Sequence, residues 1–298
     1  MSVLYKFSVG YSMKLRLPNS KSLDLSFTKV MGTIALEEND TRSIEDLVLL
    51  ANSYVKAGAE LLEIGARAGS DGINETRVMS VLCAVMNSVD VPVALNSNNY
   101  EVVSQAVKAG VSMVITTNGL ATEGMIDLIK RSNVAVCLHF DPQEKIEDDS
   151  DVVSIISEYY FERIDTLLNA GIERKRLLID PSVVNASVSN RLRLLGRLES
   201  FKSFALPICI ALPRSLPKED RFMKDNRVLT LTTALFCSSV SPVQIIRTAD
   251  VGEVAIAIGF WQIMASKTKP FKLSKTIVRR LRLLRDAIHD LRKNKEKN

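Results

Sequence analysis

The sequence lacks the features that mark a membrane or secreted protein. None of the apolar runs in its 298 residues reaches the ~18 to 20 uncharged residues that a membrane-spanning helix needs. The longest run, residues 254–265, predicts a buried helix instead. Lys6, Lys14 and Arg16 interrupt the apolar residues near the N-terminus, which argues against a signal peptide. We therefore expect a cytoplasmic protein without a transmembrane segment.

Cysteine and histidine are both scarce. Each of the four cysteines, Cys83, Cys137, Cys209 and Cys237, lies in its own apolar segment, far from the others in the sequence. We expect reduced core residues, and neither disulfides nor a metal site. Only two histidines are present, which excludes a metal centre built from several imidazoles. The motifs GxGxxG, HExxH and CxxC and the phosphate-binding P-loop are also missing, so no single motif identifies the chemistry.

From residue 29 onward, short apolar runs alternate with helical patterns. The pattern predicts eight strands, each followed by a helix, over about 240 residues. Near-continuous apolar strands are typical of strands that are buried on both faces. We therefore predict a (β/α)8 barrel, and not an open doubly wound sheet. The expected strands are residues 30–36, 61–64, 91–95, 113–116, 134–139, 177–180, 207–212 and 244–247.

Three segments follow from this pattern. Residues 1–28 predict a β-hairpin that covers the bottom of the barrel, and residues 29–266 predict the barrel itself. Residues 267–298 hold twelve Lys/Arg against three Asp/Glu, a balance of +9 within a net charge of +5. Apolar residues in this tail repeat at alternating steps of four and three, which predicts a basic amphipathic helix: Ile277, Leu281, Leu284, Ile288 and Leu291.

Two roles are open for the tail. A terminal helix of this kind docks on its own barrel or on a second copy of the chain, with a solvated basic rim. Alternatively, it contacts an acidic partner or an anionic membrane surface, because basic amphipathic helices attract phosphates.

Polar residues at the carboxyl ends of the expected strands indicate a ligand site, because barrel proteins build their sites there. They suit a polar, anionic small molecule, and we assign none of them as catalytic. A structural alternative stays open, in which Asp180 caps a loop before Pro181 and Arg247 pairs with Asp250. The candidates are Asn96, Asp180, Arg214 and Arg247 and, behind them, Thr116, His139 and Asp250.

Five pairs of motifs follow one another along the chain: Ser22-Leu-Asp-Leu-Ser26 with Val30-Met-Gly32, Ala57-Gly-Ala59 with Glu63-Ile-Gly65, Ala170-Gly-Ile172 with Leu177-Leu-Ile-Asp-Pro181, Leu206-Pro207 with Arg214, and Ile245-Ile-Arg247 with Asp250-Val251. Together they resemble dihydropteroate synthase, the pterin-binding barrel of folate synthesis. The resemblance implies a homodimeric transferase. Its reaction joins 6-hydroxymethyl-7,8-dihydropterin pyrophosphate to p-aminobenzoate and displaces pyrophosphate with the help of Mg²⁺.

Many residues that the family uses for this reaction are replaced. Asp180, Arg214 and Arg247 match the family, and the resemblance implies that Asp180 accepts hydrogen bonds from the pterin. Loss of a single donor to the charge that develops in the reaction typically removes ~3 to 4 kcal/mol of electrostatic stabilisation. The resemblance places a metal-side Asn on Ala35, an Asp on Asn96, an Asn on Ile115, a Ser on Pro213, a Lys on Ser215 and a His on Ala249.

We therefore expect a divergent homologue with little or no synthase activity, and a pterin or phosphate-bearing molecule as its ligand. No cofactor is expected in this case. A first alternative is an active synthase with Mg²⁺, and a second is a dimeric platform that presents the basic helix of residues 267–298. Methyltetrahydrofolate transferases share the barrel but use an Asp and an Asn where this chain has Asn96 and Ile115. An active synthase needs substitutes for the lost groups: Glu37, Glu38 or Asp40 for the metal, and Arg67, Lys218 or Arg221 for the pyrophosphate.

Overall fold

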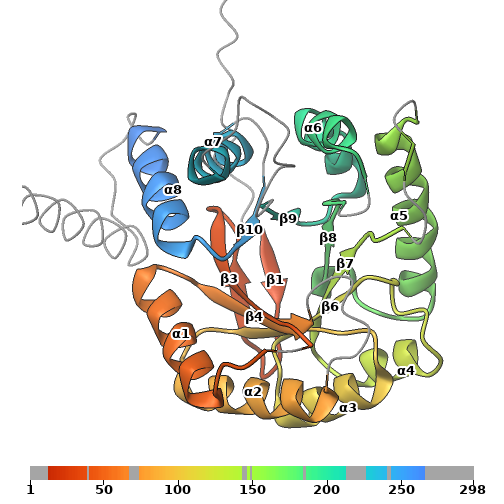
Figure 1. Ribbon diagram of the computed structural model, residues 1–298. Helices are drawn as coiled ribbons and strands as arrows, with labels where there is room; N and C mark the ends of the chain where they lie inside the picture. The colour runs from red at the N-terminus through yellow and green to blue at the C-terminus, as the bar shows by residue number, and fades with distance from the viewer. Residues whose placement is uncertain are drawn as a thin grey trace, which may run out of the picture.

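The computed structural model describes residues 13–38, 40–66, 74–142, 146–147, 150–183, 186–212, 226–239 and 243–265. Within these ranges, a ring of α-helices surrounds a cylinder of parallel strands (Figure 1). The tail of residues 267–298 lies outside the described residues. The same holds for Arg67, Arg214, Lys218 and Arg221.

Eight parallel strands form the cylinder, in the order β8-β7-β6-β5-β4-β3-β10-β9. The two end strands also meet, because Ile179 bridges to Ile208 and its backbone N–H donates to the Pro207 carbonyl at 3.0 Å. The barrel is thus nearly closed, and the predicted (β/α)8 fold is confirmed. Its strands are β3 (Lys29–Leu36), β4 (Leu61–Ala66), β5 (Val93–Asn96), β6 (Met113–Thr116), β7 (Ala135–His139), β8 (Leu177–Asp180), β9 (Cys209–Ala211) and β10 (Ile245–Thr248).

Local sequence signals define the helix ends. Ser43 begins α1 with a capping box: its side chain accepts from the Asp46 backbone, and the Asp46 side chain accepts from the Ser43 backbone. Gly58 ends the same helix at φ 112°, a left-handed conformation that glycine adopts without a steric penalty. The helices are α1 (Ile44–Ala57), α2 (Glu75–Ser88), α3 (Tyr100–Ala109), α4 (Met125–Arg131), α5 (Val152–Asn169), α6 (Val188–Gly196), α7 (Asn226–Ser239) and α8 (Val251–Ala265).

One helix differs from expectation. The sequence predicts a helix over residues 192–198, but α6 begins at Val188, where Ser187 caps it. The chain then passes into a 3₁₀ helix, η2 (Leu198–Phe204); another, η1 (Arg174–Arg176), precedes β8. None of the helices in the described part of the chain is long and apolar enough to cross a membrane.

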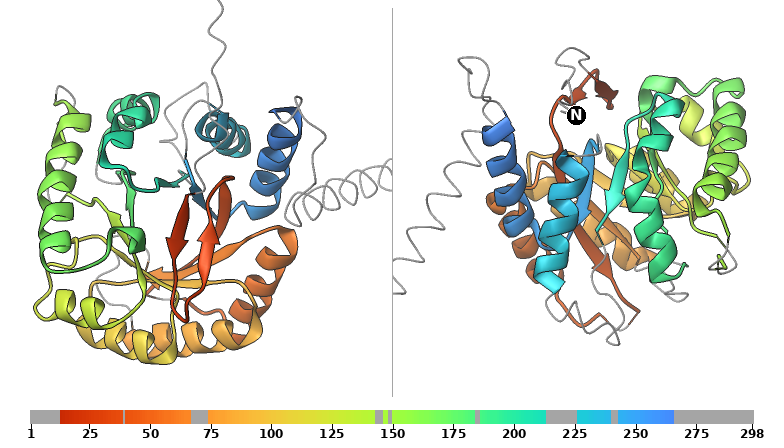
Figure 2. Two further views of the ribbon diagram at one scale, coloured as in Figure 1. Left: turned by 180° about the vertical axis from the view of Figure 1, so that it is seen from behind. Right: turned by 90° about the horizontal axis from the view of Figure 1, so that it is seen from above.

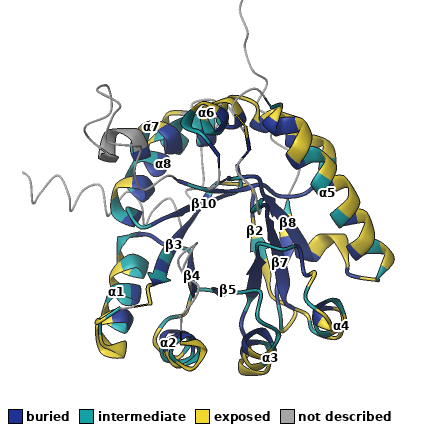
Figure 3. Cartoon of the chain, turned by 45° about the vertical axis from the view of Figure 1, so that its right-hand side comes forward, coloured by how far each residue is buried: buried dark blue, intermediate teal, exposed yellow. Residues whose placement is uncertain are grey.

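Side chains of the strands alternate between the helices and the barrel interior. Outward residues such as Ile64 and Val114 pack under the helices in the larger of two apolar clusters. Figure 3 shows the result: the barrel strands are mostly buried, and the exposed residues of the helices lie on their outer faces. Inward residues form a smaller cluster near the amino ends of the strands: Met31, Leu61, Ala94, Met113, Ile115, Ala135, Cys137, Leu178, Cys209 and Ile245.

A β-hairpin closes the amino end of the barrel. β1 (Lys14–Arg16) pairs with β2 (Ser22–Asp24) in antiparallel register, and the hairpin lies across the cylinder (Figure 2). Leu15, Leu17 and Leu25 are buried in the inner apolar cluster. A hairpin at the bottom of the barrel is therefore present within residues 14–24, and residues 1–12 of the predicted segment lie outside the described residues.

Candidate functional site

Arg247, near the carboxyl end of β10, joins two buried carboxylates. Its Nε and Nη2 atoms donate to the two carboxylate oxygens of Glu63 at 2.8 and 2.6 Å. Its Nη1 atom donates to Asp180 Oδ2 at 2.5 Å. The planar guanidinium matches the fork of a carboxylate, so the contact with Glu63 is both strong and directional. Three strands that are distant in the sequence, β4, β8 and β10, are thus tied together inside the barrel.

Asp180 is fully buried, and both of its oxygens are occupied. Oδ1 accepts from the Ser182 backbone N–H at 3.0 Å and from the Ser182 hydroxyl. Oδ2 accepts from Arg247 and lies 3.4 Å from Nδ1 of His139. Burial alone would raise the pKa of Asp180, but His139 and Arg247 outweigh it and hold that pKa well below its usual value. Asp180 is therefore a carboxylate at neutral pH.

Glu63 is the acidic partner that the sequence candidates did not include. Beyond Arg247, it accepts from Asn96 Nδ2 at 2.8 Å and from the Thr33 hydroxyl at 3.3 Å. Burial would raise the pKa of Glu63, whereas Arg247 and Asn96 lower it further than burial raises it. The sequence pointed to Glu63 in one way: it is the single carboxylate in the otherwise apolar strand β4.

The predicted candidates fall into two groups. Four candidates form one network inside the barrel: Asn96 and Arg247 donate to Glu63, Arg247 also donates to Asp180, and His139 lies beside Asp180. Arg214 lies outside the described residues. The remaining two candidates, Thr116 and Asp250, have their contacts elsewhere.

Thr116 organises the loop that follows β6. Its hydroxyl lies 2.9 Å from the side-chain oxygens of Asn98 and Asn118, and it accepts from the Leu120 backbone N–H. Like Val114, Thr116 points outward, so it supports a loop and does not line the barrel interior.

Asp250 holds the start of α8. Its Oδ2 atom accepts from the Thr230 hydroxyl at 3.4 Å, and its backbone N–H donates to Thr248. The alternative pairing of Arg247 with Asp250 is wrong, because Arg247 turns into the barrel toward Glu63 and Asp180. The other half of that alternative is confirmed: Asp180 does cap its loop, through Ser182.

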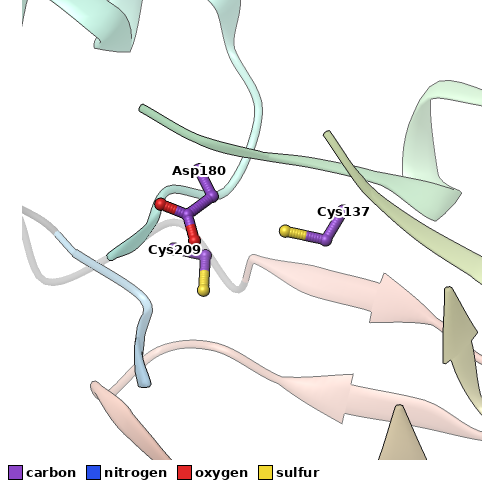
Figure 4. A group of neighbouring side chains, drawn as sticks. All are labelled: Cys137, Asp180 and Cys209. Carbon is purple, nitrogen blue, oxygen red and sulfur yellow. The ribbon is translucent and has the colours of Figure 1, made fainter. Parts of the chain in front are cut away.

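Two cysteines lie beside Asp180 in the barrel interior (Figure 4). The sulfur atoms of Cys137 and Cys209 and a carboxylate oxygen of Asp180 lie within 4.8 Å of one another. Burial, the neighbouring Cys137 and the Asp180 charge raise the pKa of Cys209 well above its usual value. The Cys209 thiol is therefore neutral, and the Asp180 oxygens already accept from other donors. All three side chains are fully buried and form the floor of the site in the barrel interior.

Two described residues near the end of β3, Ala35 and Asp40, supply no free ligand for the Mg²⁺ that the family resemblance implies, whereas Glu37 and Glu38 are exposed carboxylates in the same segment. Ala35 has no ligand atom in its side chain. Asp40, in the loop that follows, accepts from Arg42 Nε at 2.9 Å and from Arg42 Nη2 at 2.5 Å. This hydrogen bonding to Arg42 lowers the pKa of Asp40 to about 2, so the carboxylate is ionised but neutralised by a guanidinium.

Comparison with known proteins supports the resemblance to the pterin-binding family. Residues 34–241 match the family described as pterin binding enzyme. The dihydropteroate synthase of Escherichia coli K12 is 27% identical over 259 residues, which cover 80% of this chain and 92% of that protein. The Bacillus subtilis dihydropteroate synthase is 23% identical over 242 residues, 76% of this chain and 82% of its own.

Solved structures show the same fold. The dihydropteroate synthase of Xanthomonas albilineans with 4-aminobenzoic acid superposes with a TM-score of 0.78 and 24% identity, over 86% of this chain and 99% of that one. The enzyme of Coxiella burnetii in complex with pteroic acid superposes with a TM-score of 0.76 and 23% identity, over 86% and 99% of the two chains.

Proposed function

The chain belongs to the pterin binding enzyme family, and on this premise we propose that it is a dihydropteroate-synthase-like protein with little or no synthase activity. The observation that carries the proposal is the replacement at Ile115: its side chain is buried in the inner apolar cluster and offers no polar atom at a position where the resemblance implies an Asn. A second observation is that Asp180 is occupied by Arg247 and Ser182. Asp180 is the carboxylate that the family resemblance implies for the pterin. In this chain, both oxygens of the Asp180 carboxylate already accept hydrogen bonds from the protein itself.

A pterin that reached Asp180 would have to replace one of these partners. Breaking a buried ion pair by removing one side costs about 3–5 kcal/mol. At 1.4 kcal/mol for each factor of ten, this weakens binding by roughly 100- to 4000-fold unless the ligand makes new contacts of equal strength. Binding of a pterin or of a phosphate-bearing molecule is therefore weak in this protein.

The replaced positions lead to the same conclusion. Ile115 is buried and offers no polar atom to a pterin edge. The amide nitrogen of Asn96 already donates to Glu63. Ala35 has no ligand atom and Asp40 is paired with Arg42, so Mg²⁺ would depend on Glu37 and Glu38. Without the ion, the charge of the leaving pyrophosphate would lose stabilisation that is worth ~3–4 kcal/mol for a single donor.

Calorimetric titration tests the proposal. The purified protein is titrated with dihydropterin pyrophosphate and Mg²⁺, beside an Asp180→Asn variant, and then assayed with p-aminobenzoate for dihydropteroate. We expect binding weaker than micromolar and no product. Micromolar binding that is lost in Asp180→Asn, together with turnover, would show that the first alternative, an active synthase, is correct.

One observation favours self-association. Phe260 and Met264, on the outer face of α8, are 50% and 41% exposed although α8 is strongly apolar. We propose that this face meets a second copy of the chain, which light scattering of the purified protein tests.

An acidic partner for residues 267–298 and a cytoplasmic location also stay predictions. A dimeric platform predicts that partner affinity falls steeply with rising salt, because basic residues release counterions when they bind phosphates.

A further inference from the structure

We infer that Cys137, His139, Asp180 and Cys209 form a binding site for one tetrahedral zinc ion inside the barrel. The sequence predicts no metal site, because the two cysteines lie in separate apolar segments and no CxxC motif marks them. The inference goes beyond the proposed function and does not depend on it, since it concerns a metal ion and not a pterin.

Strand register brings the four side chains together. β7 carries Cys137 and His139 two residues apart, so both point to the same side of the strand. His139 is paired with Asp180 on β8, and the bridge between the two end strands places Cys209 on the other side of Asp180. Cys137 and Cys209 belong to the inner apolar cluster, which shows that this side is the barrel interior.

The donor atoms lie close to the spacing that zinc requires. The sulfur atoms of Cys137 and Cys209 and a carboxylate oxygen of Asp180 lie within 4.8 Å of one another (Figure 4). Nδ1 of His139 lies 3.4 Å from Asp180 Oδ2. Tetrahedral zinc forms bonds of ~2.0–2.3 Å, which place its ligand atoms about 3.3–3.8 Å apart. The sulfur atoms therefore need to move by ~1.5 Å at most, which rotation about the cysteine Cα–Cβ bonds provides.

Two of these donors have a lone pair to offer. His139 is 6% exposed, and its Nδ1 atom has no hydrogen-bond partner within the described part of the chain. A carboxylate offers about four acceptor positions. Ser182 uses two of them at Asp180 Oδ1, and Arg247 uses one at Oδ2. The remaining position is on Oδ2, the oxygen that lies beside His139, so one ion there would engage both side chains.

The chemistry of the donor set selects zinc among the common divalent ions. Zinc binds cysteine sulfur, histidine nitrogen and carboxylate oxygen, and structural zinc sites have four ligands. Mg²⁺ and Ca²⁺ require six or more ligands, nearly all of them oxygen, which this site does not supply. Each thiol loses its proton to solvent as its sulfur binds the ion, so occupation of the site releases two protons.

The charges around the site also suit a cation. Glu63 and Asp180 bring two negative charges against the single positive charge of Arg247. Arg247 and Ser182 hold the Asp180 carboxylate in place. Outer contacts of this kind orient the ligands of metal sites and strengthen binding.

Cobalt substitution of the reduced, full-length protein tests the inference. Co²⁺ is added to the folded protein and, separately, during refolding from denaturant, and the absorption spectrum is recorded. We expect one ion per chain, the visible bands of tetrahedral cobalt and a thiolate-to-cobalt charge-transfer band in the near ultraviolet. Zn²⁺ should displace the cobalt, whereas Mg²⁺ should not. A spectrum without the charge-transfer band under both conditions would overturn the inference.

Single cysteine variants locate the site. Cys137→Ser and Cys209→Ser should each weaken Co²⁺ binding by more than the ~10–100-fold that the loss of an outer contact costs. Cys83→Ser is the matched control, because Cys83 is a free thiol on α2, outside the barrel interior, and this variant should bind like the wild type. Equal binding by Cys83→Ser and Cys209→Ser would show that the two barrel thiols are not the ligands.

X-ray absorption of the zinc-loaded wild type keeps the test decisive when a variant does not fold. We expect two sulfur neighbours at ~2.3 Å and two nitrogen or oxygen neighbours at ~2.0–2.1 Å. A zinc ion without sulfur neighbours would overturn the inference. Four sulfur neighbours would overturn it as well, because two of them would come from outside the site.

Failure of this inference differs from failure of the proposed function. A wild-type protein that makes dihydropteroate would overturn the proposed function and leave the cobalt spectrum unexplained by any other site. A protein without the charge-transfer band would overturn only the zinc site.

Discussion

Arg247 and Glu63 are 184 positions apart in the sequence and form a two-pronged ion pair inside the barrel. Both side chains are buried, and the second carboxylate of the network, Asp180, lies on the other side of the guanidinium. The pair ties β10 to β4 in the interior of the pterin-binding fold. It also makes the barrel interior sensitive to single substitutions.

Glu63→Gln should destabilise the protein by about 3–5 kcal/mol, because it leaves the buried guanidinium without its main counter-charge. Equilibrium unfolding in urea measures the change. Glu199→Gln is the matched control: Glu199 pairs with Lys202 on the surface, where loss of a partner changes stability by at most about 1 kcal/mol. Similar losses for the two variants would mean that the buried pair has no special role.

Stability should decrease as the solution becomes more acidic. Arg247 and the neighbouring donors hold the pKa values of Asp180 and Glu63 below those of the unfolded chain, which are about 3.9 and 4.3. The unfolded state therefore takes up more protons in this window, so the free energy of unfolding falls with pH from about 5 downward. Urea midpoints at a series of pH values measure the slope. Asp180→Asn should show a shallower slope, and an unchanged slope would exclude Asp180 as a contributor.

Ser182→Ala should loosen the contact between β8 and β9. The Ser182 hydroxyl donates to Asp180 and accepts from the Ala211 backbone N–H at 2.8 Å, so its loss leaves the buried Asp180 carboxylate and the half-buried Ala211 amide each short of a partner. We expect a loss of about 1–3 kcal/mol and faster hydrogen exchange at the Ala211 amide. Ser203→Ala, on the surface of η2, should change stability by less than about 0.5 kcal/mol. An Ala211 amide that stays equally protected in Ser182→Ala would contradict the prediction.

Leu15→Ala should destabilise the barrel as a core substitution does, although Leu15 belongs to the hairpin. The side chain has no exposed surface and packs into the inner apolar cluster, so truncation should cost about 2–5 kcal/mol. Leu49→Ala, at a position that is 68% exposed, serves as the comparison and should be nearly neutral. If both variants unfold at the wild-type denaturant concentration, the hairpin does not seal the barrel.

Much of the fold follows from local patterns. The predicted strands match the observed ones to within two residues at each end, because apolar runs and helix caps are encoded by neighbours in the sequence. Ser43 and Gly58 delimit α1 through contacts with residues at most four positions away. The helix predicted over residues 192–198 shows the limit, because its start depends on the Ser187 cap and its end on the change to η2.

Patterns in the sequence were enough to predict the barrel, the family resemblance and the candidates Asp180 and Arg247. The partners of these two side chains depend on how the barrel closes. Asp250 is the nearest carboxylate to Arg247 along the chain, yet strand alternation turns Arg247 inward, where barrel closure brings Glu63 and Asp180 to it. The same closure brings together Cys137 and Cys209 from β7 and β9, on either side of β8. Such neighbours depend on strand order and stagger around a closed cylinder, which no local run of residues encodes.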